Sequence, residues 1–198
     1  WRTDGRGRSS ALPVEGLGLP GVIGPEDLMS GRRPPDGSTV VVYDDDGYYM
    51  ASALAELLAI EGFDVSYVAS ASRVADWSVR TTEQARVHGR LHELGIRIVL
   101  NHTLIRVQDG EARLVHTYTG EVLTLACQSM VPVTSREPQD KLWQELSAGA
   151  HEIRKLVRIG DCRAPGLIAT AVYDGHRAAR ELFDVELKDP ARRERVAL

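Results

Sequence analysis

Hydrophobic and polar positions change their period twice within residues 39–68, and the change predicts a strand, a helix and a second strand. A β-branched apolar run, Val40 to Val42, ends in a polar turn that begins at Asp44. Helical spacing then places four apolar residues on one face: Met50, Leu54, Leu57 and Leu58. Strand-like composition returns over residues 63–68. This order, over about 30 residues, is that of a βαβ unit.

The turn of this βαβ unit lacks the glycines of a dinucleotide-binding motif. The three glycine positions of G-x-G-x-x-G fall on Asp44, Asp46 and Tyr49. Glycines let the backbone approach a pyrophosphate, whose charge the helix N-terminus stabilises. A carboxylate about 4 Å from that charge costs roughly 4 kcal/mol at an effective dielectric near 20. The residues therefore predict a domain that keeps the nucleotide-binding fold but does not bind the dinucleotide.

Two local consequences follow from the same turn. The carboxylates are expected to cap the free N–H groups of the helix, and Tyr49 to fill the gap that the third glycine leaves between helix and strand. An ordinary acidic turn, in a domain that never bound a nucleotide, would also explain these residues. Ser70, Ser72 and Arg73 follow the second strand, where an NADP domain holds the 2′-phosphate, and they favour a working nicotinamide site instead.

The segment 38–136 reads as one domain. After the βαβ unit the pattern predicts a helix over 81–94 that is capped by Thr81 or Thr82 and ends at Gly95, and then a strand over 96–100. Three β runs follow, over residues 103–108, 111–118 and 121–127; the first two are joined by Asp109-Gly110, a strong hairpin signal. Residues 130–134 close the domain as a strand, which Pro132 makes an edge strand or an irregular one.

The C-terminal third predicts a second nucleotide-binding element. A short strand over 157–159 ends at Gly160-Asp161, and a helix is expected over 165–182 with a face of small residues. Such an Asp accepts hydrogen bonds from ribose or ribityl hydroxyls, and the helix start, at Gly166, Leu167 and Ile168, faces phosphate or flavin. This is the second half of an FAD- or ADP-binding domain, and its first half is expected to be missing.

The overall prediction is an α/β protein with a Rossmann-like nicotinamide-type (FAD/NAD(P)-binding) domain and the C-terminal half of a split FAD/ADP-binding domain. Residues 1–37 are assigned to a linker and a residual part of the split domain, and residues 38–136 to the NAD(P)-binding-like domain. Residues 137–185 form the return segment, and residues 186–198 a charged tail.

Composition narrows the classes of partner. With 43% hydrophobic and 26% charged residues and a net charge of −4, the chain is typical of globular proteins and has no basic stripe for nucleic acid. No apolar stretch approaches the ~20 residues that span a bilayer. Cys127 and Cys162 are too few for an iron–sulfur or zinc site. A cytoplasmic protein without nucleic-acid or membrane partners is predicted.

Several segments resemble one family. They are Trp1-Arg2-Thr3-Asp4-Gly5, Pro25-Glu26-Asp27-Leu28-Met29, the turn Val-Val-Tyr-Asp-Asp-Asp-Gly-Tyr-Tyr-Met, Arg90-Leu91-His92-Glu93-Leu94-Gly95 and Ile159-Gly160-Asp161-Cys162-Arg163-Ala164-Pro165. In the same order, they resemble the C-terminal portion of the trimethylamine, dimethylamine and histamine dehydrogenases. These are iron–sulfur flavoproteins of the NADH:flavin oxidoreductase, Old Yellow Enzyme-like class. The Asp-rich turn is the most specific piece, because related enoyl-CoA reductases keep glycines there. Ser135 departs from the family's usual Val-Thr-Gly-Arg.

The resemblance implies a longer parent enzyme. An N-terminal TIM barrel would carry covalent FMN and an iron–sulfur cluster, and a homodimer would pass electrons from an amine to an electron-transferring flavoprotein. The split domain would hold ADP, or FAD as in related reductases, at Gly160, Asp161 and the backbone of 166–168. No catalytic residue is assigned to this chain, which alone is expected to be inactive. The alternatives are an NADPH-binding domain of a flavin-dependent enoyl-type reductase and an interaction module.

Three lesser candidates receive structural interpretations. His88 and His92 are spaced i, i+4 on the predicted helix, but no third metal ligand is evident, which favours a solvated face. The acidic turn lacks the spacing of a calcium-binding EF-hand loop. Cys162 has no neighbouring His in the sequence and is interpreted as a packed small residue and not as a nucleophile.

Overall fold

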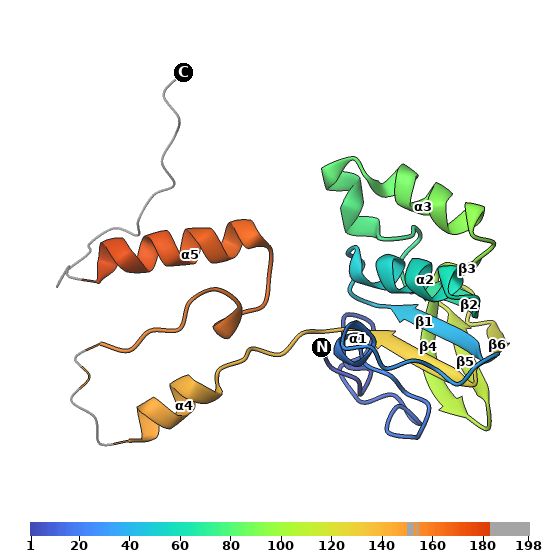
Figure 1. The fold of residues 1–198 in the computed structure, drawn as a ribbon, viewed down its shortest axis with the longest axis horizontal. Helices are drawn as coiled ribbons and strands as arrows, with labels where there is room; N and C mark the ends of the chain where they lie inside the picture. The colour runs from blue at the N-terminus through green and yellow to red at the C-terminus, as the bar shows by residue number, and fades with distance from the viewer. Residues whose placement is uncertain (150–152, 154, 183–198) are drawn as a thin grey trace. The chain divides into compact units, whose positions relative to one another are not determined.

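The computed structural model describes residues 1–149, 153 and 155–182, which form two units, one within residues 1–135 and one within 136–198. A parallel sheet with the strand order β3-β2-β1-β7 lies at the centre of the first unit (Figure 1). Its strands are β1 (Thr39–Asp44), β2 (Asp64–Ala69), β3 (Arg97–Val99) and β7 (Ser129–Val133). The side chains of β1 from Val40 to Asp44 are all buried, as a strand covered on both faces requires. The predicted α/β fold with a parallel sheet is confirmed.

Helices cover one face of this sheet. The predicted βαβ unit is present, with α2 (Met50–Ile60) between the parallel strands β1 and β2. Leu54 and Leu58 of α2 pack in one core cluster with Val40 and Val42 of β1. The next helix, α3 (Gln84–Glu93), begins later than predicted, because a 3-10 helix, η1 (Asp76–Thr81), precedes it. Glu83, and neither Thr81 nor Thr82, is the N-cap residue of α3.

An antiparallel three-stranded sheet adds a second core cluster. Its strands are β4 (His102–Gln108), β5 (Glu111–His116) and β6 (Val122–Ala126), and they confirm the predicted meander. Leu104, Leu114 and Leu125 from the three strands pack in one cluster with Val41 and Tyr43 of β1. Asp109 and Gly110 join β4 to β5 with φ of 53° and 79°, the left-handed backbone of a type I′ hairpin turn.

Strand β7 lies at the edge of the parallel sheet, as Pro132 predicts. Its outer side is partly paired with the N-terminal segment. The Met130 N–H donates to the Gly21 carbonyl (2.9 Å), and the Ile23 N–H donates to the Met130 carbonyl (2.9 Å). Proline has no N–H to donate and is tolerated at such an edge.

The N-terminal segment, residues 1–37, is irregular in backbone but packs within the first unit. Its one helix is α1 (Pro25–Met29), and its buried side chains include Val14, Leu17, Ile23 and Leu28. The first two belong to the cluster under the antiparallel sheet and the last two to the cluster under α2. The segment is therefore irregular in its backbone path, but its side chains form part of both core clusters of the first unit.

The second unit contains α4 (Lys141–Ala148), a 3-10 turn η2 (Gly160–Cys162) and α5 (Ile168–Glu181). The predicted strand over 157–159 is wrong: Ile159 has extended dihedrals, but no neighbouring strand lies among the described residues of this unit to pair with it. Helix α5 begins at Ile168 and not at residue 165, because Leu167 is still extended (φ −83°, ψ 154°). The predicted charged tail, 186–198, lies outside the described residues.

Across the described ranges, no helix combines the length and the apolar composition that crossing a bilayer requires.

Candidate functional site

Asp44 ends β1 at the carboxyl edge of the parallel sheet, where open α/β sheets bind their ligands. Its side chain is 2% exposed. Asp44 Oδ1 accepts a hydrogen bond from the Gly47 N–H (2.7 Å), and Oδ2 accepts one from the Tyr67 hydroxyl. The Tyr67 oxygen in turn accepts from the Ala75 N–H (3.1 Å). One buried carboxylate thus connects the turn, β2 and the loop before η1.

Burial disfavours the ionised form of this carboxyl. It raises the pKa of Asp44 to about 7, against the hydrogen bonds from Tyr67 and the Gly47 N–H, which favour the carboxylate. The charges of Asp46 and Asp45 add to the rise. The pKa of Tyr67 is also well above its usual value, because the phenol is buried and faces Asp44.

Asp45 is equally buried, and its partners come from two distant segments. Oδ2 accepts from the Ser9 N–H (2.8 Å), while Oδ1 accepts from the hydroxyls of Ser9 (2.5 Å) and Ser70 (2.8 Å). The backbone N–H groups of Asp45 and Asp46 both donate to the Val133 carbonyl, at 2.9 and 3.1 Å. The amides of residues 45–47, which would face a bound phosphate in a glycine-rich turn, therefore already have partners within the protein.

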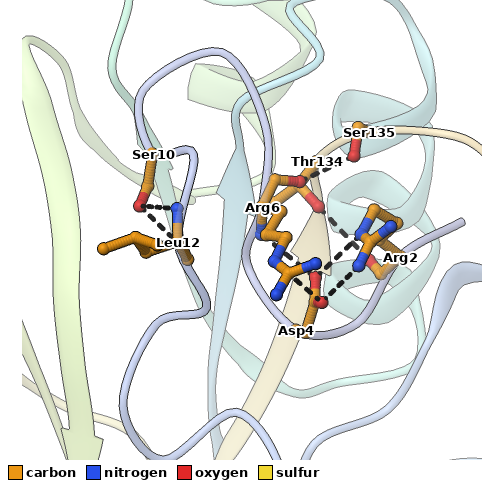
Figure 2. Close-up of polar contacts among 7 residues, drawn as sticks. All are labelled: Arg2, Asp4, Arg6, Ser10, Leu12, Thr134 and Ser135. Atoms are coloured by element: carbon orange, nitrogen blue, oxygen red, sulfur yellow. Dashed lines mark hydrogen bonds and ion pairs between the residues drawn. The ribbon is translucent and has the colours of Figure 1, made fainter.

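Figure 2 shows polar contacts that hold the N-terminal loop to Thr134 and Ser135, which follow β7. Arg2 donates two hydrogen bonds to Asp4 (3.0 and 2.6 Å), which lower the pKa of that carboxyl to about 2. The Arg2 N–H donates to the Ser135 carbonyl (2.8 Å), and the Thr134 hydroxyl donates to the Arg2 carbonyl (3.2 Å). The Ser135 hydroxyl donates to the Arg6 carbonyl (2.7 Å). The unusual Ser135 thus helps to hold the loop.

Trp77 and two arginines cover the turn. The backbone N–H of Trp77 donates to the Gly47 carbonyl (2.9 Å). The guanidinium groups of Arg8 and Arg80 lie 5.7 and 4.1 Å from the centroid of the Trp77 ring. Arg8 also donates to the Asp46 carbonyl (3.3 Å). Sequence reasoning missed Ser9, Arg8 and Trp77. The only signal for the first two is the pair of glycines at residues 5 and 7, which permits close backbone approach.

Two expectations about the start of α2 are wrong. The helix begins at Met50 with Tyr49 as its N-cap residue and no side-chain cap, because the Asp44 carboxylate is already bonded within the turn. The Tyr49 side chain is 57% exposed and packs edge-on against the Tyr48 ring, at 5.3 Å between centroids. The buried side chains in the first turn of α2 are the small ones of Ala51 and Ser52, so Tyr49 fills no gap.

Of the residues that favoured an NADP site, Ser70 is bonded to Asp45, whereas Ser72 and Arg73 are exposed. On α3, the rings of His88 and His92 stack at 5.0 Å with an angle of 10°. Burial, and then the charge of His92, lower the pKa of His88. Among the described residues, no three Asp, Glu, His or Cys side chains converge as metal ligands would.

The second unit brings its candidate residues together where α5 begins. Gly160 has φ of +56°, and a Cβ there would lie 3.3 Å from the Ala171 Cβ, so the small face of α5 does permit close approach. Asp161 Oδ1 accepts from the Gly166 N–H (3.1 Å). No described side chain caps α5, and the side chains of Leu167 and Ile168 are 46% and 84% exposed. These residues could bind a phosphate or ribose through backbone N–H groups and one carboxylate.

The two cysteines differ in environment. Cys127 is buried directly after β6, where burial raises the pKa of its thiol to about 12, and its Sγ lies 3.4 Å from the Ser129 carbonyl oxygen. Cys162 is half-buried in the η2 turn, directly after Asp161.

A parallel sheet with a buried central strand, flanked by a helical layer and an antiparallel meander, defines a mixed α/β domain. The chain belongs to the family of the OYE-like second alpha/beta domain, whose model matches residues 23–148.

The relatives that match most of this chain are longer proteins. The chain is 32% identical to dimethylamine dehydrogenase from Hyphomicrobium sp. (strain x), over 94% of this chain and 28% of that protein. It superposes on histamine dehydrogenase from Rhizobium sp. 4-9 with a TM-score of 0.90 and 39% identity, over 100% of this chain and 32% of the other. It also superposes on the 6-hydroxypseudooxynicotine amine oxidase HisD of Pseudomonas geniculata N1, with a TM-score of 0.88 and 36% identity, over 93% of this chain and 28% of the other. The predicted resemblance is confirmed, and the chain spans about three tenths of the length of these relatives.

Proposed function

We propose that this chain is the C-terminal region of an amine-oxidising FMN and iron–sulfur oxidoreductase that passes electrons to an electron-transferring flavoprotein. The observation that carries the proposal is the match of the whole chain, at 39% identity, to histamine dehydrogenase. The parent is a cytoplasmic homodimer whose N-terminal TIM barrel holds the catalytic centre. The 198-residue chain alone is therefore inactive.

Within the parent, the first unit is a Rossmann-like domain that binds no nicotinamide. Its support is the turn after β1, where the carboxylates of Asp44 and Asp45 are buried and hydrogen-bonded at the pyrophosphate position. An enzyme that delivers its electrons to a protein acceptor has no need of a nicotinamide site there.

The second unit supplies the return half of a split nucleotide-binding domain that holds ADP or FAD. Gly160 and Asp161 would contact the ribose, and the backbone of Gly166, Leu167 and Ile168 would face the phosphates. The local geometry fits such a ligand, because Gly160 is left-handed and α5 starts without a side-chain cap among the described residues. The bound nucleotide supplies packing and negative charge here; no chemical step is assigned to it.

The full-length protein tests the activity directly. Dimethylamine, trimethylamine and histamine are offered to the purified enzyme, with either an electron-transferring flavoprotein or NADP⁺ as acceptor, and its visible spectrum is recorded. Amine-dependent reduction of the flavoprotein, together with flavin and iron–sulfur absorbance, is the expected result. Saturable NADPH binding at micromolar concentration would instead favour an NADPH domain of a flavin-dependent enoyl-type reductase, for which the exposed Ser72 and Arg73 are the support.

The nucleotide site has its own test. Acid extraction of the full-length protein, followed by chromatography, identifies and counts the bound nucleotide. Asp161→Ala is expected to lower the amount of ADP or FAD per protein by about tenfold, the effect of losing one or two hydrogen bonds to a charged group. Asp64→Ala, which removes an exposed carboxylate at the start of β2, is the matched control. Equal nucleotide content in both variants would remove Asp161 from the site.

A further inference from the structure

The Asp45 carboxylate is surrounded by three hydrogen-bond donors. One donor is a backbone N–H, that of Ser9, and two are hydroxyls, those of Ser9 and Ser70. Asp45 itself is only 2% exposed, whereas Ser9 is exposed, so the three bonds are partly buried; hydrogen bonds to a carboxylate are stronger than those between neutral groups. A backbone N–H and paired hydroxyls around a buried anion are a donor set that proteins use for phosphate.

The chain also closes tightly around this carboxylate. Gly7 lies so near that a Cβ on it would overlap Asp45 Oδ2. The Gly7 N–H donates to the Ser10 carbonyl (2.9 Å), which bends residues 7–10 into a turn around the anion. Arg8 then reaches the Asp46 carbonyl and the Trp77 ring. We call residues 6–10 the N-terminal strap.

We propose that Ser9 and Ser70 form an oxyanion pocket in which the Asp45 carboxylate is the resident anion, and that this internal ligand fastens the N-terminal strap across the turn after β1. A tetrahedral oxyanion such as phosphate is the class of ligand that the pocket accepts once the carboxylate is removed. The inference deepens the proposal that this turn binds no dinucleotide, and it names the group that occupies the place.

The test uses Asp45→Ala in the full chain, with Asp64→Ala as the matched control for loss of an Asp side chain. Hydrogen exchange at the Ser9 amide and trypsin cleavage after Arg6 and Arg8 are measured. Exchange and cleavage are expected to become at least about tenfold faster in Asp45→Ala, because Ser9 loses a charge-assisted hydrogen bond, and to stay unchanged in Asp64→Ala.

Inorganic phosphate is then titrated into each variant, against sodium chloride at equal ionic strength. In Asp45→Ala, phosphate is expected to restore slow exchange at Ser9 in a saturable way, and in the wild type it is expected to change nothing. Unchanged exchange in Asp45→Ala would overturn the fastening role. Faster exchange that phosphate does not reverse would overturn the oxyanion pocket.

A second variant keeps the proposal testable if Asp45→Ala fails to fold. Gly7→Ala places a methyl group against Asp45 Oδ2, so it is expected to open the strap as the loss of the carboxylate does. If Gly7→Ala leaves the Ser9 amide and the two tryptic sites protected, the strap is not held by this contact. None of these measurements involves an amine or a nucleotide, so failure of the proposed enzymatic function would leave them intact.

Discussion

The turns that precede α2 and α5 use their polar groups in opposite ways. After β1, the carboxylates of Asp44 and Asp45 are buried and accept hydrogen bonds from the turn, from Tyr67 and from two serines. Before α5, Asp161 is exposed and holds one backbone N–H, while no described side chain caps the helix. An acidic residue near a helix start can therefore be either buried with several partners of its own or exposed with only one backbone partner. Burial distinguishes the two cases.

The largest effect is expected at Asp44, whose raised pKa should make the stability of the first unit depend on pH. Below about pH 4 this carboxyl is protonated in the folded and unfolded states alike. Between about pH 4 and 7 the unfolded chain has released the proton and the folded chain retains it, so stability falls as pH rises. The rise of the pKa from 3.8 to about 7 corresponds to about 4 kcal/mol by pH 8. Asp44→Asn, which stays neutral, should abolish this loss.

The measurement is urea unfolding of wild type and Asp44→Asn at pH 5 and pH 8. The variant should gain about 4 kcal/mol relative to the wild type at pH 8 and less than half of that at pH 5, where only the first part of the loss has occurred. Asp64→Asn removes an exposed carboxylate and should leave the pH dependence unchanged. If Asp44→Asn follows the same pH dependence as the wild type, burial at the end of β1 is not what raises the pKa.

The next effect concerns the hydroxyl that holds Asp44. Tyr67→Phe removes a donor from a buried carboxylate and an acceptor from the Ala75 N–H, so a loss of about 2–3 kcal/mol is expected. It should be larger at pH 8 than at pH 5, because the ionised carboxylate needs the donor most. Urea unfolding at both pH values measures it. The control is Tyr118→Phe, at a residue that is 78% exposed. This control should change stability by less than about 0.5 kcal/mol, as surface substitutions usually do.

The smallest effects compare a glycine in each turn. Gly47 has φ of +73°, and a Cβ on it would lie 2.9 Å from Arg8 and 3.1 Å from Trp77. Gly160 has φ of +56° and only one near contact, Ala171. Gly47→Ala should therefore cost about 2 kcal/mol and Gly160→Ala about 1 kcal/mol. Native-state hydrogen exchange in β1 and in α5 reports each unit separately. A larger loss for Gly160→Ala would mean that the second turn is the more tightly packed one.

The sequence predicts those parts of the fold whose signals are local. The change of period at residues 39–68 identifies the βαβ unit, and Asp109-Gly110 identifies the hairpin between β4 and β5. The η1 helix was missed because it follows Ala75, whose backbone is left-handed (φ 45°) and whose N–H donates to Tyr67 on another element. The strand predicted at 157–159 failed because pairing depends on a neighbour and not on composition.

In the candidate site, too, the features with a local sequence signal could be predicted and the long-range contacts could not. That Asp44 and Asp46 replace glycines can be read from the sequence, and so can the position of Gly160 and Asp161 before a helix. The bonds from Ser9 to Asp45 join residues 36 positions apart, and no periodicity marks such a contact. The outward side chain of Tyr49 was likewise missed, because smaller residues occupy the buried positions at the start of α2.

The contrast between the two thiols has a practical use. Maleimide reagents attack the thiolate, and a buried thiol with a pKa of about 12 supplies almost none at neutral pH, so Cys127 should resist labelling. Cys162, half-buried beside Asp161, then becomes the selective attachment point for a fluorophore within this chain. If the proposed nucleotide site at Gly160 and Asp161 is correct, the emission of a dye at that position should change when ADP or FAD is added.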